Sequence, residues 1–570
     1  MLFAISLAFL ASGATAGSDV YDWLSLKDEY SMSIKPIFDS KCVACHSCFN
    51  GPCQLKLSSF WGAHRGASKI GIYDFARATA IKPTRMFEDA RTTNDWRKKG
   101  FYSVVDANTN NKPILLTMIE DLGGIEDGLQ TMYESEKSRV CINSASKKNI
   151  LNYKEKNKSG RMPYGLPKLS TKEISAIKKW IRGGASGPDL QEVENQVLNH
   201  PKIKHLVKKW ENFLNQEDLK TQLSARYFYE HLFLAHIAFD KKSGIYFRLV
   251  RSKSKIGIIQ PIGTALPYDD PNRKFYYRFM PELETLTYKN HIPFYLDNKK
   301  LAKWKKEFVL STWKEKLTKL PAYGRSGANP FKVFRLIPVQ ARYNFLLDEA
   351  GYFVMSFIKG PVCRGPTALN VINDHFWVMF VDPKEDPSVN DPTLYSFIEG
   401  KMNFPAAAKG DIMPISEYRQ RYWQTVKFKF DRIKSKGKAT STKMIWNGGK
   451  NKNTNSLLTV FRHFDSAHVM RGLQGRTPKT LWLLDYHVFE TIYYNLTAGY
   501  NVFGPGQHQL NSRVFMDLSR IAAEDYFISM LPQKYRTPLR LNWNKPAPKS
   551  KKNTKICNIC RCRIRGCRIC

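Results

Sequence analysis

The segment CVACH at positions 42–46 places two thiols and one imidazole within five residues. Cys-x-x-Cys-His is the attachment motif of c-type haem, in which both thiols bond to the porphyrin vinyl groups and the histidine ligates the iron. We therefore predict one covalently bound haem c, held by Cys42 and Cys45, with His46 as the proximal ligand. Two alternatives stay open. A zinc site needs further ligands at matching spacing, and a plain Cys42–Cys45 disulfide gives His46 no role.

The sixth iron ligand of such a haem usually comes from far downstream. Met162 lies in the proline-punctuated segment GRMPYGLPKLS (160–170), which is typical of the end of a cytochrome c domain. A thioether ligand raises the reduction potential of the iron relative to a second imidazole. We predict Met162 as the distal ligand. His64 is the alternative ligand, and Met162 would then only fill space against the haem face. Its long separation from His46 requires an insertion within residues 54–159.

Two more cysteines, Cys48 and Cys53, follow the pentapeptide directly. We interpret them as a disulfide that closes the loop after His46; the alternatives are free thiols or metal ligands. Such a bond requires an oxidising compartment outside the cytoplasm.

The first residues have the features of an export signal. An apolar run covers 2–10, and Ala14-Thr15-Ala16 supplies the small residues that a signal peptidase reads, so we expect cleavage near Ala16. The run is preceded by no Lys or Arg, and an uncleaved membrane anchor is the alternative. No later stretch approaches the ~18 uninterrupted apolar residues of a membrane span, so we expect a soluble or peripheral mature protein.

The composition indicates a globular protein with a polyanionic neighbour. Hydrophobic residues make up 43% of the 570 residues, enough for substantial cores. The formal net charge is +39, from 89 basic and 50 acidic residues. Nucleic acid and an anionic membrane surface both fit such a charge, and export favours the membrane and excludes nucleic acid. A generally basic source proteome is the alternative explanation.

The elements that must position the pentapeptide can be predicted from periodicity. Ser170 and Glu173 form a capping box, and Gly183 and Gly184 close the helix that follows. Apolar residues share one face of that helix: Ile174, Ile177, Trp180 and Ile181. Further helices are predicted at 217–239, 298–319, 338–359, 478–498 and 511–531, and strands at 244–250, 275–280 and 375–381.

The predicted fold class is α+β and mostly helical, with an N-terminal cytochrome c-like helical domain followed by a larger mixed domain. The predicted helix 298–319 is rich in Lys but carries apolar residues near one face: Leu301, Trp304, Phe308 and Leu317. Such a helix faces a protein core or lies on a membrane surface. Both interpretations stay open.

Two groups of polar residues stand in strongly apolar surroundings. The first group contains Cys363, Arg364, Asn373, Asp374 and His375; the second contains Arg462, His463 and Asp465. Buried polar groups need partners, so each group is either a structural network or part of a site. No catalytic triad, phosphate-binding loop or pair of catalytic carboxylates is recognisable.

Several long segments together resemble the bacterial fatty-acid cis/trans isomerases, from about residue 20 to about 543. They are CVACHSCFNGPCQLKL, GRMPYGLPKLS, YEHLFLAH, PYDDPNRKFYYRF, GPVCRGPTALNVINDHFWV, RHFDSAH and GQHQLNSR. The resemblance implies a periplasmic haem enzyme that converts cis-unsaturated acyl chains of membrane phospholipids to trans without net redox change. By this resemblance Cys42 and Cys45 hold the haem, His46 is proximal and Met162 distal.

The alternative function is a periplasmic electron-transfer cytochrome joined to a lipid- or partner-binding module. A multihaem peroxidase is disfavoured because the attachment motif occurs once.

We predict four parts: a signal peptide at 1–16, a cytochrome c-like haem domain with an insertion at 17–190, a lipid-substrate domain at 191–548 and a basic tail at 549–570. The tail holds five of the 11 cysteines: Cys557, Cys560, Cys562, Cys567 and Cys570. Members of the resembling family continue further, so we interpret the tail as a frameshifted or prematurely ended reading frame. A small zinc site is the alternative.

Overall fold

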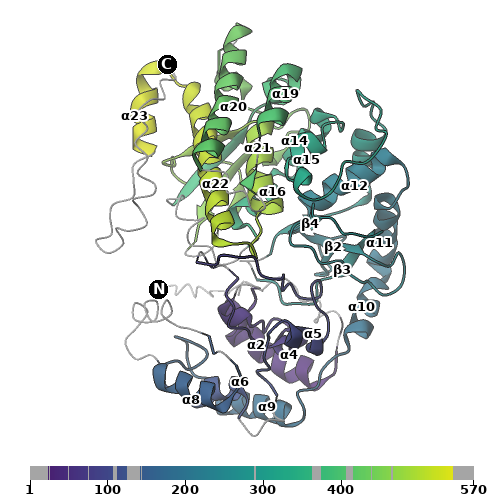
Figure 1. Cartoon of the computed structure of the whole chain (residues 1–570), viewed down its shortest axis with the longest axis vertical. Helices are drawn as coiled ribbons and strands as arrows, with labels where there is room; N and C mark the ends of the chain where they lie inside the picture. Colours follow the sequence, from purple (N-terminus) through teal and green to yellow (C-terminus); the bar gives the residue numbers. More distant parts are fainter. Residues whose placement is uncertain are drawn as a thin grey trace, which may run out of the picture.

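The computed structural model describes residues 24, 26–48, 51–72, 74, 76–106, 112–124, 141–142, 144–287, 291–361, 374–402, 404–405, 415–437, 439–463 and 467–543. Helices dominate these ranges, and the strands form two four-stranded sheets (Figure 1). The predicted class, α+β and mostly helical, is confirmed. Within the described ranges, every helix is too short or too polar to cross a bilayer.

Short helices make up the N-terminal part. The predicted capping box is present at the start of α9: the Glu173 amide donates to the Ser170 hydroxyl, and the Ser170 amide donates to the Glu173 carboxylate. Trp180 of α9 is fully buried and packs against Tyr30 and Phe38, with ring centroids 5.6 and 6.2 Å away. The helices of this part are η1 (Tyr30–Ile34), α2 (Lys35–Lys41), α3 (Val43–His46), α4 (Phe60–Arg65), α5 (Thr93–Lys98), α6 (Ile114–Glu120), α8 (Lys147–Lys156) and α9 (Thr171–Arg182).

The first sheet has the strand order β3-β2-β1-β4. Its strands are β1 (His236–Ala238), β2 (Phe247–Ser252), β3 (Tyr276–Pro281) and β4 (Pro293–Tyr295). Strands β1 and β4 are parallel, and the other pairs are antiparallel. Three helices precede the sheet, α10 (Leu190–Leu198), α11 (Pro201–Leu214) and α12 (Leu219–His231); α13 (Asn298–Trp304) and the π-helical turn η3 (Lys305–Val309) follow it.

The second sheet repeats this arrangement, with the order β7-β6-β5-β8 and only β5 and β8 parallel. Its strands are β5 (His375–Phe380), β6 (Leu457–Arg462), β7 (Ala467–Arg471) and β8 (Leu481–Leu484). Helix α16 (Ala350–Lys359) precedes it, and α21 (Tyr486–Tyr493) and a second π-helical turn, η8 (Tyr494–Ala498), follow it. Asp297 caps α13 and Asp485 caps α21 in the same way. The larger part of the chain therefore contains an internal structural repeat.

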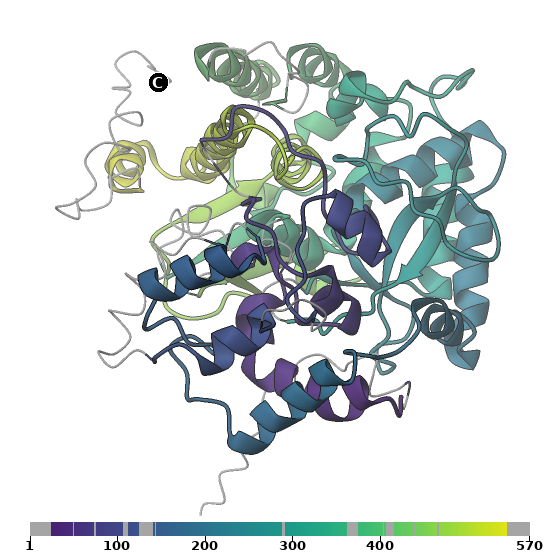
Figure 2. The same cartoon turned by 60° about the horizontal axis from the view of Figure 1, so that its bottom comes forward.

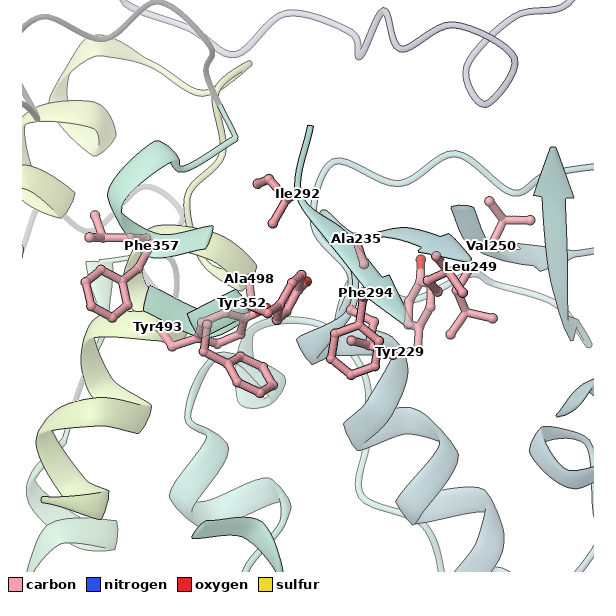
Figure 3. Packing of buried hydrophobic residues seen from close by; sticks show 14 of the residues in the cluster. Tyr229, Ala235, Leu249, Val250, Ile292, Phe294, Tyr352, Phe357, Tyr493 and Ala498 are labelled. Atoms are coloured by element: carbon pink, nitrogen blue, oxygen red, sulfur yellow. The ribbon is translucent and has the colours of Figure 1, made fainter. Parts of the chain in front are cut away.

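Buried aromatic side chains join the two repeats. Phe294 of β4 meets Tyr352 of α16 edge to face, with ring centroids 4.8 Å apart (Figure 3), and Tyr493 of α21 meets Phe353 of α16 edge to face. The hydroxyl of Tyr352 donates to the carbonyl of His231 at the end of α12. The remaining helices are α14 (Pro330–Val333), α15 (Val339–Asp348), α18 (Pro387–Asn390), α19 (Pro392–Lys401), α20 (Ile415–Ser435), α22 (Gly506–Ser529) and α23 (Gln533–Trp543), with short 3-10 turns η2 (Pro52–Gln54), η4 (Arg325–Ala328), η6 (Thr442–Met444) and η7 (Thr454–Ser456).

The N-terminal part lies against both repeats (Figure 2). The amide of Ile81 donates to the carbonyl of Phe503, and the guanidinium of Arg77 donates to the carbonyls of Val502 and Gly504. Residues 76–86 therefore extend from the N-terminal helices to the turn that precedes α22.

Three predicted helices differ from the structure. The ranges 217–239 and 478–498 each contain a strand, β1 and β8, because a short buried strand is continuously apolar and has no period that separates it from a helix. The range 298–319 is helical only to Val309, and Leu301, Trp304 and Phe308 are buried in the core. The membrane-surface interpretation of this helix is therefore wrong.

Candidate functional site

The pentapeptide forms one helical turn that continues α2. The amide of Cys42 donates to the carbonyl of Phe38 over 2.8 Å, and the amide of His46 donates to the carbonyl of Cys42 over 2.9 Å. Residues three and four apart lie on the same face of a helix. The turn therefore presents the thiols of Cys42 and Cys45 and the imidazole of His46 on one side.

The ring of His46 is buried and oriented by the backbone. Its Nδ1 lies 3.2 Å from the carbonyl oxygen of Leu55, and the amide of Leu57 donates to the carbonyl of His46 over 2.8 Å. When Nδ1–H donates to a carbonyl, the lone pair of the ring is on Nε2, and metal-binding histidines are commonly held in this way. We call residues 55–57 the strap, because they fix His46 at both its ring and its backbone.

The cysteines divide into two groups. Cys48, Cys53 and Cys141 are disulfide-bonded, whereas Cys42 and Cys45 are not. Burial raises the pKa of the Cys42 thiol to about 12, and the nearby Cys45 adds to the rise. A thiol must lose its proton to bind zinc, and burial opposes that loss at Cys42.

The predicted disulfide between Cys48 and Cys53 is wrong. Cys53 bonds to Cys141, with a Cα–Cα distance of 5.5 Å across a sequence separation of 88 residues. Proximity in sequence does not determine connectivity, because any pair of cysteines that the fold brings together can bond. The bond ties the loop after the pentapeptide to the segment that precedes α8.

The two predicted distal ligands lie in different environments. Met162 is half-buried against the core, and its amide donates to the carbonyl of Met118 in α6. The Nε2 of His64 lies 2.7 Å from the carbonyl oxygen of Ala185. This contact engages the ring nitrogen that would bind iron. No described contact joins Met162 to His46, so its role as distal ligand stays a prediction. In the part of the chain that the structure describes, no three His, Cys, Asp or Glu side chains are grouped to hold a metal ion.

A segment of the first repeat, residues 282–287, is hydrogen-bonded to residues on both sides of the pentapeptide. Its central residue, Thr285, donates its amide to the carbonyl of Ser58 and its hydroxyl to Asp39, and accepts from the ammonium of Lys35, each over 2.8 Å. We call 282–287 the docking segment. It holds the strap side of the pentapeptide against the larger part of the chain.

The docking segment also forms a buried ion pair, between Glu284 and Lys56 of the strap. Each side chain is 7% exposed, and the hydroxyl of Ser58 also donates to Glu284. Lys56 is the central residue of the strap, so its neighbours on both sides are hydrogen-bonded to His46. The pair therefore couples the position of His46 to the docking segment.

A cavity of about 120 Å³ lies beside this ion pair. It is a partly open pocket bordered by the strap, the docking segment, the ends of β1 and β2 and the turns that follow α16 and η8. Its apolar lining comprises Met86, Phe233, Leu234, Ala265, Leu286, Ile292, Pro361, Tyr500, Val502 and Phe503. Its polar lining comprises Lys56, Arg85, Glu88, His236, Arg248, Glu282 and Glu284.

Most of the charges in the cavity wall are neutralised by ion pairs. Arg85 pairs with Glu88 and Asp89, and Arg248 pairs with Glu88 over 3.0 Å. Glu282 is different, since its nearest basic neighbour is Nε2 of His236 at 3.7 Å. Burial, followed by the repulsion of Glu284, raises the pKa of Glu282 to about 7.

A stacked pair of histidines adjoins Glu282. The Nδ1 atoms of His236 and His291 are 3.1 Å apart. Burial lowers the pKa of both rings, to about 4 for His291, whose neighbour Lys359 adds to the effect. Burial also lowers the pKa of Lys359 to about 8. At neutral pH the two imidazoles are therefore uncharged, and Glu282 and Lys359 titrate close to that pH.

The described members of the two predicted polar groups are not among the residues that line this cavity. His375 is buried and its Nε2 lies 2.6 Å from the carbonyl oxygen of Arg476, while the exposed Asp374 pairs with the Arg476 side chain. These contacts are those of a structural network. His463 is exposed, and the structure places it 6.4 Å from the ring of His468. Of the other predicted members, Arg462 is the last residue of β6, and Cys363, Arg364, Asn373 and Asp465 lie outside the described residues.

Sequence reasoning missed the residues that line the cavity. Lys56, His236, Glu282 and Glu284 come from separate segments, and no short motif joins them. The one signal available was the pair of acidic residues in PELETLT (281–287), a polar interruption between two apolar stretches.

One family has a sequence model that matches most of the chain. It is described as fatty acid cis/trans isomerase (CTI), and the match covers residues 81–559. The matched range contains Met162, both sheets and all the cavity-lining residues except Lys56, and it begins after the pentapeptide. No curated protein and no solved structure matches the chain.

Proposed function

The chain belongs to the fatty acid cis/trans isomerase family, and we propose that it isomerises the cis-unsaturated acyl chains of membrane phospholipids by means of one covalently bound haem. Isomerisation of unsaturated fatty acids is the activity of the family. The haem, the phospholipid form of the substrate and a periplasmic location at an anionic membrane surface are our proposal.

The observation that supports the haem most directly is the strap. It donates and accepts the hydrogen bonds that fix His46, and its central residue, Lys56, lines the cavity. One three-residue segment thus connects a histidine whose Nε2 is available to ligate a metal with a cavity lined by both apolar and ion-paired side chains. Cys42 and Cys45, on the same helical turn as His46, are the residues that would bond to the vinyl groups.

A ferric haem bound at this turn would supply transient withdrawal of electron density from the alkene, which lowers the bond order and permits rotation. The chain's own residues have the other tasks. The carbonyl of Leu55 holds the proton of His46 on Nδ1 and so keeps Nε2 as the ligand atom. Met162, as the distal ligand, would raise the reduction potential of the iron and so make the ferric form easier to reduce. The electron density would return to the alkene, so the reaction would consume no external donor or acceptor.

The cavity would receive the unsaturated segment of one acyl chain. Its volume of about 120 Å³ equals the share of roughly four water molecules in the liquid, so it accommodates a short segment rather than a whole chain. Phe233, Leu286 and Phe503 supply apolar surface for that segment. The ion pairs that neutralise the wall lower the cost of replacing water by methylene groups.

The experiment is an assay of purified protein with phospholipid that carries cis-unsaturated chains, without electron donor or acceptor. The trans fraction is measured by gas chromatography of the methyl esters. We expect trans chains to accumulate with the wild type and not with Cys45→Ser or His46→Ala. Undiminished activity in a folded, haem-free variant would remove iron from the mechanism. Reduction and reoxidation of the haem without any isomerisation would favour the electron-transfer cytochrome.

A further inference from the structure

The loop between β2 and β3 exposes two isoleucines. Ile256 is 81% exposed, more than any other large apolar side chain in the described ranges, and Ile258 is 52% exposed. Single exposed apolar residues are ordinary on protein surfaces. Two of them, two residues apart at the tip of one hairpin, need a further explanation. We call residues 253–260 the tip.

The tip has a fixed backbone. The amide of Lys253 donates to the carbonyl of Gln260 over 3.0 Å, and the hydroxyl of Ser252 accepts from the amides of Ser254 and Gln260 over 3.2 and 3.1 Å. Gly257 turns the chain with a φ of +71°, and a Cβ there would meet nothing within 4 Å.

A side chain from β3 adds to this support. The guanidinium of Arg278 donates to the carbonyls of Ser254 and Gly257, each over 3.4 Å. Ser254 also donates its hydroxyl to the carbonyl of Ile258. The two isoleucines are therefore held in solvent by a hydrogen-bonded turn, and burying them elsewhere would require breaking it.

Basic residues surround the isoleucines. Lys253 and Lys255 are exposed on the tip itself, and Lys274 is exposed just before β3, with its ammonium 5.7 Å from the ring of Tyr276. The sequence RSKSKIGIIQPI (251–262) contains no acidic residue. Exposed apolar side chains between flexible cations match the boundary of an anionic bilayer, where acyl chains lie just beneath phosphate groups.

We propose that the tip inserts Ile256 and Ile258 into the interfacial region of an anionic phospholipid bilayer, while Lys253, Lys255 and Lys274 contact lipid phosphates. This inference rests on the proposed function in that a membrane phospholipid supplies the substrate. The hairpin also connects the tip to the cavity, since Arg248 and Glu282 lie at the far ends of β2 and β3. Six residues of strand span about 20 Å. When the tip is inserted, the cavity therefore lies roughly 20 Å from the lipid headgroups.

The experiment uses full-length holoprotein and vesicles of phosphatidylglycerol mixed with phosphatidylcholine. We expect the double variant Ile256→Ser with Ile258→Ser to partition onto the vesicles at least roughly tenfold more weakly than the wild type. The matched control is Leu310→Ser, which removes a side chain that is 78% exposed outside the tip. It should change partitioning by less than about twofold, because a position outside the tip has no share in this contact.

A second measurement tests insertion without depending on the loss of binding. In Ile256→Trp, the additional indole emission relative to the wild type should shift to the blue on addition of vesicles, and brominated acyl chains should quench it. Unchanged emission together with wild-type partitioning of the double serine variant would overturn the proposal. A blue shift with a partner protein but not with vesicles would also overturn it, in favour of a protein-binding surface.

Activity separates this proposal from the proposed function. The double serine variant should isomerise detergent-dispersed phospholipid at the wild-type rate and vesicle phospholipid several-fold more slowly. A wild type that inserts its tip but isomerises neither substrate would contradict the proposed function and leave the membrane contact intact. Equal loss of both rates would contradict the tip proposal, since it would indicate damage to the site rather than to membrane access.

Discussion

Replacing Lys56 by Met removes the cation that neutralises Glu284 in the wall of the cavity. Each side chain of this pair is 7% exposed, so both charges lie away from water. In Lys56→Met, Glu284 retains the hydrogen bond from Ser58, but its charge has lost its direct partner. Breaking a buried ion pair by removing one partner typically costs about 3–5 kcal/mol, because the charge that remains is neither solvated nor paired.

The same estimate predicts recovery when the second charge is removed as well. Replacing both members of a buried pair by apolar residues of similar volume is often close to neutral. The double variant Lys56→Met with Glu284→Leu should therefore recover most of the lost stability, giving a coupling free energy of at least about 2 kcal/mol. The exposed pair Arg335–Glu315, at 44% and 57% exposure, serves as the matched control. The double-mutant cycle of this exposed pair should give a coupling free energy of less than about 1 kcal/mol.

The assay is urea unfolding at pH 7 of the wild type, both single variants and the double variant, followed by circular dichroism and by limited proteolysis of the N-terminal part. The midpoint for Lys56→Met should fall markedly, and proteolysis should detect release of the strap region first. A loss of less than 1 kcal/mol in Lys56→Met would refute the reasoning. So would a double variant as unstable as the single one, because the cost could not then come from an unpaired Glu284.

Three further predictions concern single groups. Burial raises the pKa of Glu282 from 4.5 to about 7, so the unfolded chain loses this proton first as the pH rises, and the folded state loses stability between those two pH values. The difference in unfolding free energy between Glu282→Gln and the wild type should therefore be about 3 kcal/mol more favourable to the variant at pH 8 than at pH 4. A difference that does not change with pH would argue against a buried, protonated carboxyl. Cys53→Ser should cost about 4–5 kcal/mol, the chain-entropy value for a separation of 88 residues; a midpoint equal to that of the wild type under oxidising conditions would count against the Cys53–Cys141 bond. Met162→Ala should convert the ferric visible spectrum from low spin toward high spin, whereas an unchanged spectrum would show that another residue is the distal ligand.

Local patterns in the sequence were sufficient for the elements with strong local signals. The capping box at Ser170 and Glu173 sets the start of α9, and the burial of Trp180 follows from its helical period. The helical turn at the pentapeptide likewise agrees with a motif whose residues must share one face. In these places the interactions that form the element are made by residues close together in the sequence, so a short sequence window is enough to predict the element.

The features that were missed depend on contacts between distant segments. Strands β1 and β8 are three and four residues long and fully buried, so their apolar runs merged with the neighbouring helices in the sequence pattern. The structural repeat shows in strand order and in the equivalent caps at Asp297 and Asp485, not in a periodic motif. The disulfide between Cys53 and Cys141 joins residues that are 88 positions apart in the sequence.

The cavity is another such feature. His236 and Glu284 are separated along the chain from Lys56 by more than the length of the N-terminal part, and only the packing of the first repeat against the strap brings them together. The sequence motif identified His46 as the predicted metal ligand, but it did not identify the surface against which His46 is held. That surface is formed by tertiary contacts alone.

The central claim is that the turn at 42–46 carries a covalently bound porphyrin. The direct measurement is an absorption spectrum of the protein, purified from cells competent in cytochrome c maturation and then denatured in guanidinium and separated from free cofactor. The account predicts a Soret band that stays with the polypeptide at one haem per chain and disappears in the double variant Cys42→Ser with Cys45→Ser. A wild-type chain that carries no Soret band after this treatment would contradict it.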